Sequence, residues 1–109
     1  MSKKDDRIYV GHMADMIAEA LNISKGKSKG EFTSDKTLQL ALTHLIQIIG
    51  EAASKISVEF KEKNAQIPWM TIISMRHRVV HDYLNVDIEI VWDTVQNDLP
   101  ELAQWLQAI

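Results

Sequence analysis

Four residues with reactive or phosphate-binding side chains lie close together in the sequence MRHRVVHDY. They are Arg76, His77, His81 and Tyr83. Histidine titrates near neutral pH, so one imidazole can take the proton of an RNA 2′-hydroxyl and another can protonate the leaving 5′-oxygen. Arginine can hold the phosphate and the negative charge that grows on it. This combination is suited to cleavage of an RNA phosphodiester bond without a metal ion.

Two other interpretations of these residues are open. Arg76 interrupts an apolar helix face, where it could form a structural ion pair, for example with Glu51 on the preceding helix. His77 and His81 have the i, i+4 spacing that lets two imidazoles share a metal ion on a helix. A metal site is disfavoured, because Arg78 stands where a zinc protease has glutamate and no third ligand is evident.

Helical periodicity predicts that one helix positions all four residues. Apolar side chains recur at the spacing of a single helix face from Trp69 to Tyr83. At about 100° per residue, Arg76 and Tyr83 fall on this apolar face, whereas His77 and His81 lie side by side on one flank. We therefore expect Arg76 on a buried or interfacial surface.

The rest of the chain has the same periodicity, and strand-like alternation is nearly absent. Helices are expected at Asp5 to Ile23, Ser34 to Lys63, Pro68 through Tyr83, from Asp87 towards Pro100, and Pro100 to Ala108. Ser34 and Asp87 are suitable N-caps, while Pro100 should interrupt or end the fourth helix. Gly50, close to two alanines, predicts that another helix approaches the second one closely. The predicted fold is an all-α antiparallel bundle of four longer helices and a short C-terminal helix, in one domain over residues 1–109.

A single helix cannot easily place a base and an acid on opposite sides of one phosphate. Two copies of that helix, related by a dimer axis, can do so. A dimer interface would also explain why an arginine stands on an apolar face. The sequence therefore favours a homodimer in which two copies of the Arg76–His81 segment face one cleft.

Composition limits the remaining possibilities. The 109 residues include no cysteine, and the apolar and charged fractions of 46% and 25% are typical of a globular protein with one core. The net charge of −3 argues against a broad basic surface for nucleic acid, but not against a few phosphate contacts in a local cleft. A charged N-terminus and the lack of a long apolar run favour a cytoplasmic protein with no membrane span.

Other features have simpler explanations. The GKS sequence at residues 26–28 is similar to the end of a phosphate-binding loop, but Leu21 stands where the first glycine is required. His12 and His44 lie near helix faces and are interpreted as surface or core histidines. The lysine-rich loop SKGKSKG is interpreted as a solvated connection, although its lysines could touch phosphate.

Arg76, His81 and Tyr83 form the pattern R-x-x-x-x-H-x-Y, which resembles the signature of HepT-like toxins, ribonucleases of the HEPN superfamily. The resemblance covers nearly the whole chain, because four segments are similar to that family in the same order: RIYVGHM, IIGEAASKIS, IPWMTIISMRHRVVHDY and VDIEIVWDTVQNDLPEL. It implies a dimeric helical bundle with metal-independent endoribonuclease activity, no cofactor, and Arg76 and His81 as the catalytic pair. His77 occupies a position that is polar across the superfamily, and the resemblance leaves open whether it assists the chemistry or orients the phosphate.

The resemblance also implies a partner protein. HepT-like toxins are paired with a minimal nucleotidyltransferase antitoxin, which transfers AMP to the motif tyrosine, here Tyr83. A nucleotide on Tyr83 would block the cleft and repel RNA phosphate. The bundle is also compatible with a different class of function, a non-catalytic helical module that binds nucleotides or the nucleotidyltransferase. The intact set of Arg76, His81 and Tyr83 favours the ribonuclease toxin over this alternative.

Overall fold

Helices make up most of the structure, a computed structural model that describes the backbone of residues 3–82 and 85–109 and the side chains of residues 5–80 and 85–109. The elements are α1 (Lys3–Ser24), α2 (Lys29–Thr33), α3 (Lys36–Ser54), α4 (Val58–Lys63), α5 (Trp69–Val79), β1 (Val80–Asp82), β2 (Asn85–Val86), α6 (Ile88–Asp93), the π-helical turn η1 (Thr94–Asp98) and α7 (Leu99–Gln107). The prediction of an all-α fold is confirmed, since the strands add one short antiparallel hairpin. Tyr83 lies outside the described residues, as does the side chain of His81.

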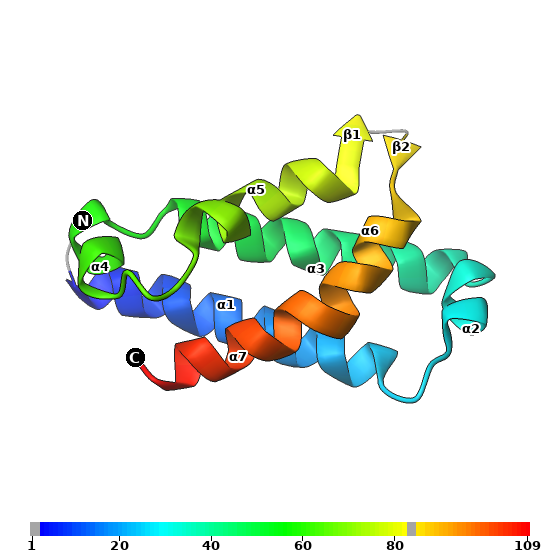
Figure 1. Ribbon diagram of the computed structural model, residues 1–109, viewed down its shortest axis with the longest axis horizontal. Helices are drawn as coiled ribbons and strands as arrows, with labels where there is room; N and C mark the ends of the chain where they lie inside the picture. Colours follow the sequence, from blue (N-terminus) through cyan, green and yellow to red (C-terminus); the bar gives the residue numbers. More distant parts are fainter. Residues whose placement is uncertain (1–2, 83–84) are drawn as a thin grey trace.

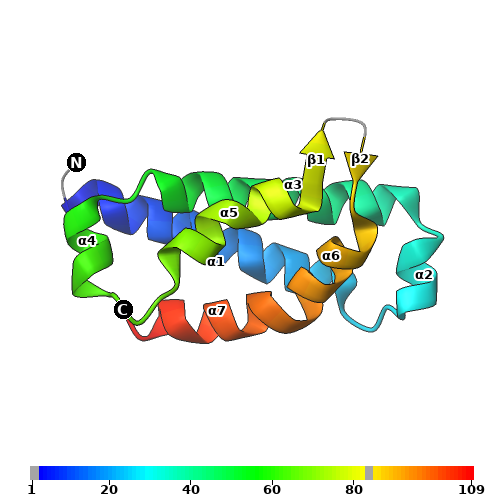
Figure 2. The ribbon, with the colours of Figure 1, turned by 45° about the horizontal axis from the view of Figure 1, so that its top comes forward.

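Long helical segments form the body of the bundle. α1 and α3 lie antiparallel, α5 packs on α3, and the run from α6 through η1 to α7 returns along α1 (Figures 1 and 2). The side chains that fill the space between them are apolar and almost fully buried; the largest are Phe32, Met13, Ile17, Leu42, Ile46, Ile49, Ile67, Ile72 and Leu99. Within the described part of the chain, no helix combines the length and the apolar character needed to cross a membrane.

The second predicted helix is two helices in the structure. Asp35, instead of Ser34, caps α3, and the chain leaves the helix at residues 55–57 before Ser57 caps α4. Asp6 of α1, which is 1% exposed, accepts hydrogen bonds from the Ser57 amide (2.8 Å) and the Ser57 hydroxyl (2.7 Å). The continuous helix expected over residues 34–63 is therefore wrong, because a buried carboxylate from a distant helix holds Ser57 in an extended conformation.

The lysine-rich loop contains a short helix that was not expected. The Ser28 hydroxyl accepts a hydrogen bond from the Glu31 amide (3.1 Å), and the Glu31 carboxylate accepts one from the Ser28 amide (3.2 Å). This reciprocal capping box begins α2. The buried ring of Phe32 packs on Trp92, with ring centroids 5.1 Å apart, and so fixes α2 against α6.

The chain stays helical past Pro100. Asp87 caps α6, as predicted, by accepting a hydrogen bond from the Ile90 amide (3.2 Å). The Leu99 amide then donates to the Thr94 carbonyl, which is the wider hydrogen bond of a π-helical turn. Pro100 lies in the first turn of α7, where its missing amide hydrogen costs little. The α-helical hydrogen-bonding pattern is thus interrupted just before Pro100, as expected, but the chain does not leave the helix there.

The third predicted helix ends earlier than expected. α5 begins after Pro68, as predicted, but it stops at Val79, and Val80 is already extended with φ −128° and ψ 110°. The Asp87 amide donates to the Val79 carbonyl (2.8 Å), while Val80 pairs with Val86 in the hairpin. The helix predicted through position 83 is therefore too long, because hydrogen bonds to the following strand replace those of the next helical turn.

Candidate active site

Gly50 of α3 lets α5 approach closely beside Arg76. A Cβ atom at Gly50 would lie 3.3 Å from the carbonyl oxygens of Ile72 and Ile73 and 3.5 Å from the Cβ atom of Arg76. A larger side chain at this position would push the two helices apart, because close-packed backbone atoms cannot yield easily. The close approach predicted at Gly50 is confirmed, and it fixes the level at which Arg76 faces α3.

Arg76 forms an ion pair across this contact. Its Nη1 atom donates a hydrogen bond to the Glu51 carboxylate, and the two side chains are 29% and 55% exposed respectively. The structural interpretation of Arg76, as the partner of Glu51, is therefore confirmed. A guanidinium group has five N–H donors, however, and the Nε atom of Arg76 is buried without a hydrogen-bond partner among the described residues. The ion pair thus leaves Arg76 with hydrogen-bonding capacity for an anion.

An open groove lies beside this ion pair, between α3 and α5. Its volume is about 430 Å³, and its lining consists of His44, Gln47, Ile48 and Glu51 on one side and Arg76, His77 and Val80 on the other. Pockets that bind small molecules span about 300–1,000 Å³, so this groove is large enough for a nucleotide unit of RNA. The groove holds one guanidinium, one carboxylate and two imidazoles. Protonation of either imidazole therefore makes the net charge of the groove positive.

His77 and His81 do not share a helix face. The exposed His77 ring borders the groove from the last turn of α5, whereas His81 belongs to β1, beyond the end of the helix. The helix on which the wheel was based therefore does not reach His81. The backbone of His81 directly follows Val80, which lines the groove. Among the described residues, no three His, Cys, Asp or Glu side chains come together in a way that could hold a metal ion.

His44 is the groove residue that the sequence analysis missed. It was interpreted as an ordinary surface or core histidine, and the structure places its exposed ring on the groove wall. A signal was present in the sequence, because His44, Gln47 and Glu51 follow the i, i+3, i+7 spacing of one polar helix stripe next to Gly50. This stripe could be assigned to the face of α5 only once the helix contact at Gly50 was known.

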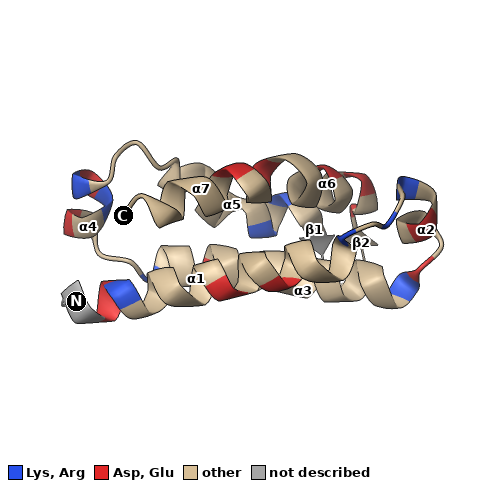
Figure 3. Ribbon diagram, turned by 90° about the horizontal axis from the view of Figure 1, so that it is seen from below, with Lys and Arg blue, Asp and Glu red and all other residues tan. Residues whose placement is uncertain are grey.

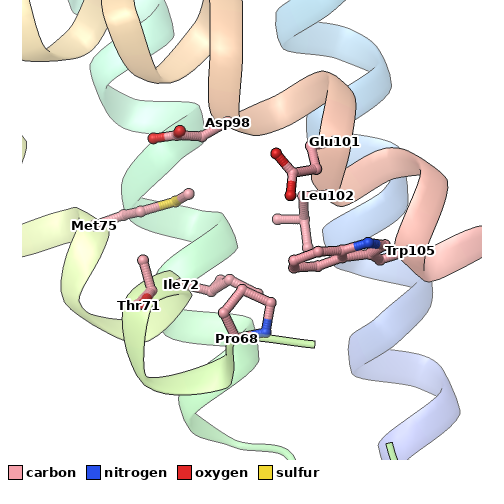
Figure 4. Close-up of a pocket in the computed structure, with 8 residues that line it drawn as sticks. All are labelled: Pro68, Thr71, Ile72, Met75, Asp98, Glu101, Leu102 and Trp105. Atoms are coloured by element: carbon pink, nitrogen blue, oxygen red, sulfur yellow. The ribbon is translucent and has the colours of Figure 1, made fainter. Parts of the chain in front are cut away.

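A second cavity, about 190 Å³ in volume, lies between α5 and α7 (Figure 4). Its wall is mainly apolar, and two carboxylates and an indole point towards it; the lining residues are Pro68, Thr71, Ile72, Met75, Asp98, Glu101, Leu102 and Trp105. Arg78 forms an ion pair with one of these carboxylates, Asp98 (3.5 Å). The carboxylates of this cavity would repel phosphate, so it is not a candidate site for RNA.

The basic residues of the described chain do not form a continuous stripe. Figure 3 shows Lys and Arg as separate segments near the start of α1, in the loop before α2, and at α2, α4 and α5, with acidic and uncharged ribbon between them. In the lysine-rich loop, Lys29 forms an ion pair with Glu89 (2.7 Å), and the hydrogen bond to this carboxylate raises the pKa of Lys29. A continuous basic surface is thus not seen among the described residues, as the net charge of the sequence predicts.

The all-α bundle is consistent with one class of protein, the HepT-like ribonucleases. The family model described as ribonuclease HepT-like matches residues 13–109. A protein of Caldanaerobacter subterraneus subsp. tengcongensis named "Putative RNase" is 33% identical over 106 residues, which are 97% of this chain and 95% of the relative. A protein of Thermococcus cleftensis named "Probable ribonuclease HepT" is 32% identical over 100 residues, covering 92% of this chain and 91% of the relative. The chain therefore belongs to the HepT-like ribonuclease family.

A third relative is a longer protein. This protein of Methanocaldococcus jannaschii is named "Gamma-glutamylcyclotransferase and putative RNase", and it is 35% identical over 102 residues. The matched segment is 94% of this chain but only 46% of the relative, so the chain spans about half of that protein's length. No solved structure gives a significant match to the sequence.

Proposed function

We propose that this protein is a metal-independent endoribonuclease that cleaves RNA in the groove between α3 and α5, with Arg76 and His81 as its catalytic pair. The observation that supports this proposal most is the position of Arg76. Its side chain is half buried beside an open groove, and its Nε atom has no partner in the described chain. The family motif places His81 five residues later, where β1 leaves the rim of this groove.

In the proposed reaction, His81 takes the proton of a 2′-hydroxyl, and the 2′-oxygen attacks the adjacent phosphorus atom. The bond from phosphorus to the 5′-oxygen breaks, the leaving oxygen is protonated, and the products carry a 2′,3′-cyclic phosphate and a 5′-hydroxyl. Arg76 stabilises the charge that grows on the non-bridging phosphate oxygens. His77 orients the phosphate from the last turn of α5. The reaction consumes no cofactor, because the nucleophile belongs to the RNA.

We further propose that the protein is the cytoplasmic toxin of a toxin–antitoxin pair and that AMP transfer to Tyr83 silences it. The partner that this requires is the minimal nucleotidyltransferase implied by the family resemblance. Tyr83 follows His81 by two residues, so AMP on its hydroxyl would bring a phosphate near the strand that begins at the groove. That phosphate would compete with RNA for Arg76 and repel the RNA backbone.

We also propose a homodimer, on the basis of the family resemblance. The argument that a dimer interface explains the arginine on an apolar face is weaker than the sequence suggested. Glu51 of the same protomer already pairs with Arg76. A dimer interface is therefore not needed to accommodate the arginine. The mass measured by light scattering at micromolar concentration tests the assembly, and a monomer at that concentration would contradict it.

Cleavage of labelled RNA in the presence of EDTA tests the proposed activity. The wild type should produce 2′,3′-cyclic phosphate ends, and Arg76→Ala or His81→Ala should lower the rate about a hundredfold or more. Two matched controls lie outside the groove: Arg78→Ala removes an arginine paired with Asp98, and His12→Ala removes an exposed histidine of α1. Both controls should retain nearly full activity.

Two results would contradict this mechanism. One is wild-type cleavage that requires magnesium. The other is equal loss in the control variants and in the groove variants, which would indicate a general effect on folding. A purified wild type that binds RNA without cutting it would instead favour the non-catalytic module.

A further inference from the structure

The cavity between α5 and α7 has no role in the proposed ribonuclease chemistry. α5 uses two different faces: Arg76 and His77 border the groove with α3, whereas Thr71 and Met75 border this cavity with α7. At about 190 Å³ the cavity is smaller than pockets for drug-sized ligands, which begin at about 300 Å³. It therefore suits a single side chain, and the groove and the cavity share no lining residue.

The floor of the cavity is apolar, and its rim is acidic. Ile72 and Leu102 of the floor are buried, while the carboxylates of Asp98 and Glu101 and the indole of Trp105 point towards the cavity (Figure 4). The last three residues follow the i, i+3, i+7 spacing of one helix stripe along the path from η1 to α7. An occupant that matches this lining has an apolar stem and a cationic end.

The charge of the rim is not balanced within the described chain. Arg78 pairs with Asp98 at 3.5 Å, and both side chains are partly exposed. Glu101 is exposed and forms no ion pair with any residue that the structure describes. Two carboxylates and one guanidinium leave one negative charge, so a single additional cation neutralises the rim.

The indole of Trp105 favours a guanidinium group as that cation. A guanidinium is planar, stacks on an aromatic face and can pair with a carboxylate through two N–H groups, whereas an ammonium is a compact, strongly hydrated charge. The indole N–H of Trp105 has no acceptor among the described residues, unlike that of Trp69, which donates to the Asn64 carbonyl (3.1 Å). A backbone carbonyl next to the guanidinium side chain would supply this acceptor. An arginine within a polypeptide therefore matches the cavity better than a free guanidine does.

We propose that the α5–α7 cavity is a docking site for an arginine side chain of a different protein. The stem of that arginine lies on the apolar floor, and its guanidinium stacks on Trp105 and pairs with Glu101. This inference does not depend on the proposed RNA cleavage, because no residue of the α3–α5 groove takes part in it.

Small probes test the cavity in the full chain through the indole N–H signals of the three tryptophans in ¹⁵N NMR spectra. n-Butylguanidinium should shift the Trp105 signal, which is assigned by its absence in Trp105→Phe, with a Kd on the order of millimolar. The signal of Trp92, whose ring packs on Phe32, should stay in place. n-Butylammonium should bind more weakly, and 1-butanol, which has the stem without the charge, should shift the Trp105 signal far less.

Charge variants test the role of the rim. Glu101→Gln should weaken the binding of n-butylguanidinium about twofold to fivefold, because it removes one exposed ion pair and keeps the shape of the side chain. The double variant Asp98→Asn/Glu101→Gln should abolish saturable binding, since Arg78 then leaves the rim positive. Glu19→Gln removes an exposed carboxylate of α1 that does not line the cavity, and it should bind as the wild type does. None of these three changes should shift the thermal unfolding midpoint by much, because the side chains are not buried.

Three results would overturn the proposal. Equal shifts with 1-butanol and n-butylguanidinium, or binding that Glu101→Gln leaves unchanged, would indicate an apolar cavity without selection for a cation. The tripeptide acetyl-Gly-Arg-Gly-amide should bind at least as tightly as n-butylguanidinium, and its failure to bind would exclude a polypeptide. A change in the mass of the protein alone in light scattering, caused by the double variant, would identify a second copy of this chain as the occupant.

Discussion

Glu51→Gln is expected to strengthen RNA binding, although it removes the ion-pair partner of Arg76. In the free protein Glu51 holds the arginine that the proposed mechanism assigns to phosphate. An incoming phosphate must therefore share or replace this carboxylate. Glutamine keeps the size of the side chain and its hydrogen-bonding groups, so the substitution changes mainly the negative charge.

The size of the effect follows from the exposure of the pair. Two like charges about 5 Å apart repel by about 0.8 kcal/mol in water and by about 3 kcal/mol at an effective dielectric constant of about 20. The Glu51 side chain is 55% exposed, so the repulsion energy should be close to the smaller value, that in water. Removal of about 1 kcal/mol of repulsion corresponds to about a fivefold lower Kd. The free energy of unfolding should fall by no more than about 1 kcal/mol, which is the range of exposed ion pairs.

Fluorescence anisotropy with a labelled 2′-fluoro RNA measures this Kd, because such an RNA lacks the nucleophile and is not cleaved. The tighter binding should be clear at low salt and should shrink at high salt, where exposed charges are screened. Glu19→Gln removes an exposed carboxylate from α1, away from the groove, and should change the Kd much less. Weaker binding by Glu51→Gln, comparable to that of Arg76→Ala, would refute this reasoning and show that Glu51 mainly positions the arginine.

Three further substitutions test the fold and the regulation. Gly50→Val should lower the free energy of unfolding by about 1–3 kcal/mol in urea titrations, because its side chain meets two carbonyl oxygens of α5; an unchanged midpoint would contradict the close packing. Asp6→Ala should cost about 1–3 kcal/mol by leaving the Ser57 amide and hydroxyl without their partner, whereas Asp15→Ala, at an exposed position of the same helix, should be nearly neutral in thermal unfolding. Tyr83→Phe should keep most ribonuclease activity yet escape silencing on co-expression with the nucleotidyltransferase; a variant silenced as well as the wild type, or no added AMP on the wild-type peptide by mass spectrometry, would speak against modification of Tyr83.

Helical periodicity in the sequence was sufficient to predict the all-α fold and the extent of α1. These features depend on side chains three or four residues apart, and such pairs are visible in a single sequence. The cap at Asp87 and the start after Pro68 are local for the same reason. The capping box of Ser28 and Glu31 was equally local, so α2 could have been predicted from that pattern.

The breaks in the helices depended on partners that are distant in the sequence. The end of α3 depends on Asp6, whose carboxylate lies 51 residues before Ser57. The end of α5 depends on pairing with β2, which competes with the next helical turn. Periodicity continues through both places, and apolar residues such as Ile56 and Val79 are buried there. The sequence pattern alone therefore predicted helices that are too long.

The sequence by itself determined the class of protein and the candidate residues Arg76, His77 and His81, because motif spacing and residue type are local properties. The tertiary structure alone decided what faces Arg76. Gly50 removes the side chain that would separate α3 from α5, and the resulting contact brings Glu51 to Arg76 and His44 to the opposite wall of the groove. Such a meeting depends on the register of two helices. That register is set by the packing of the whole core, which no local pattern of residues contains.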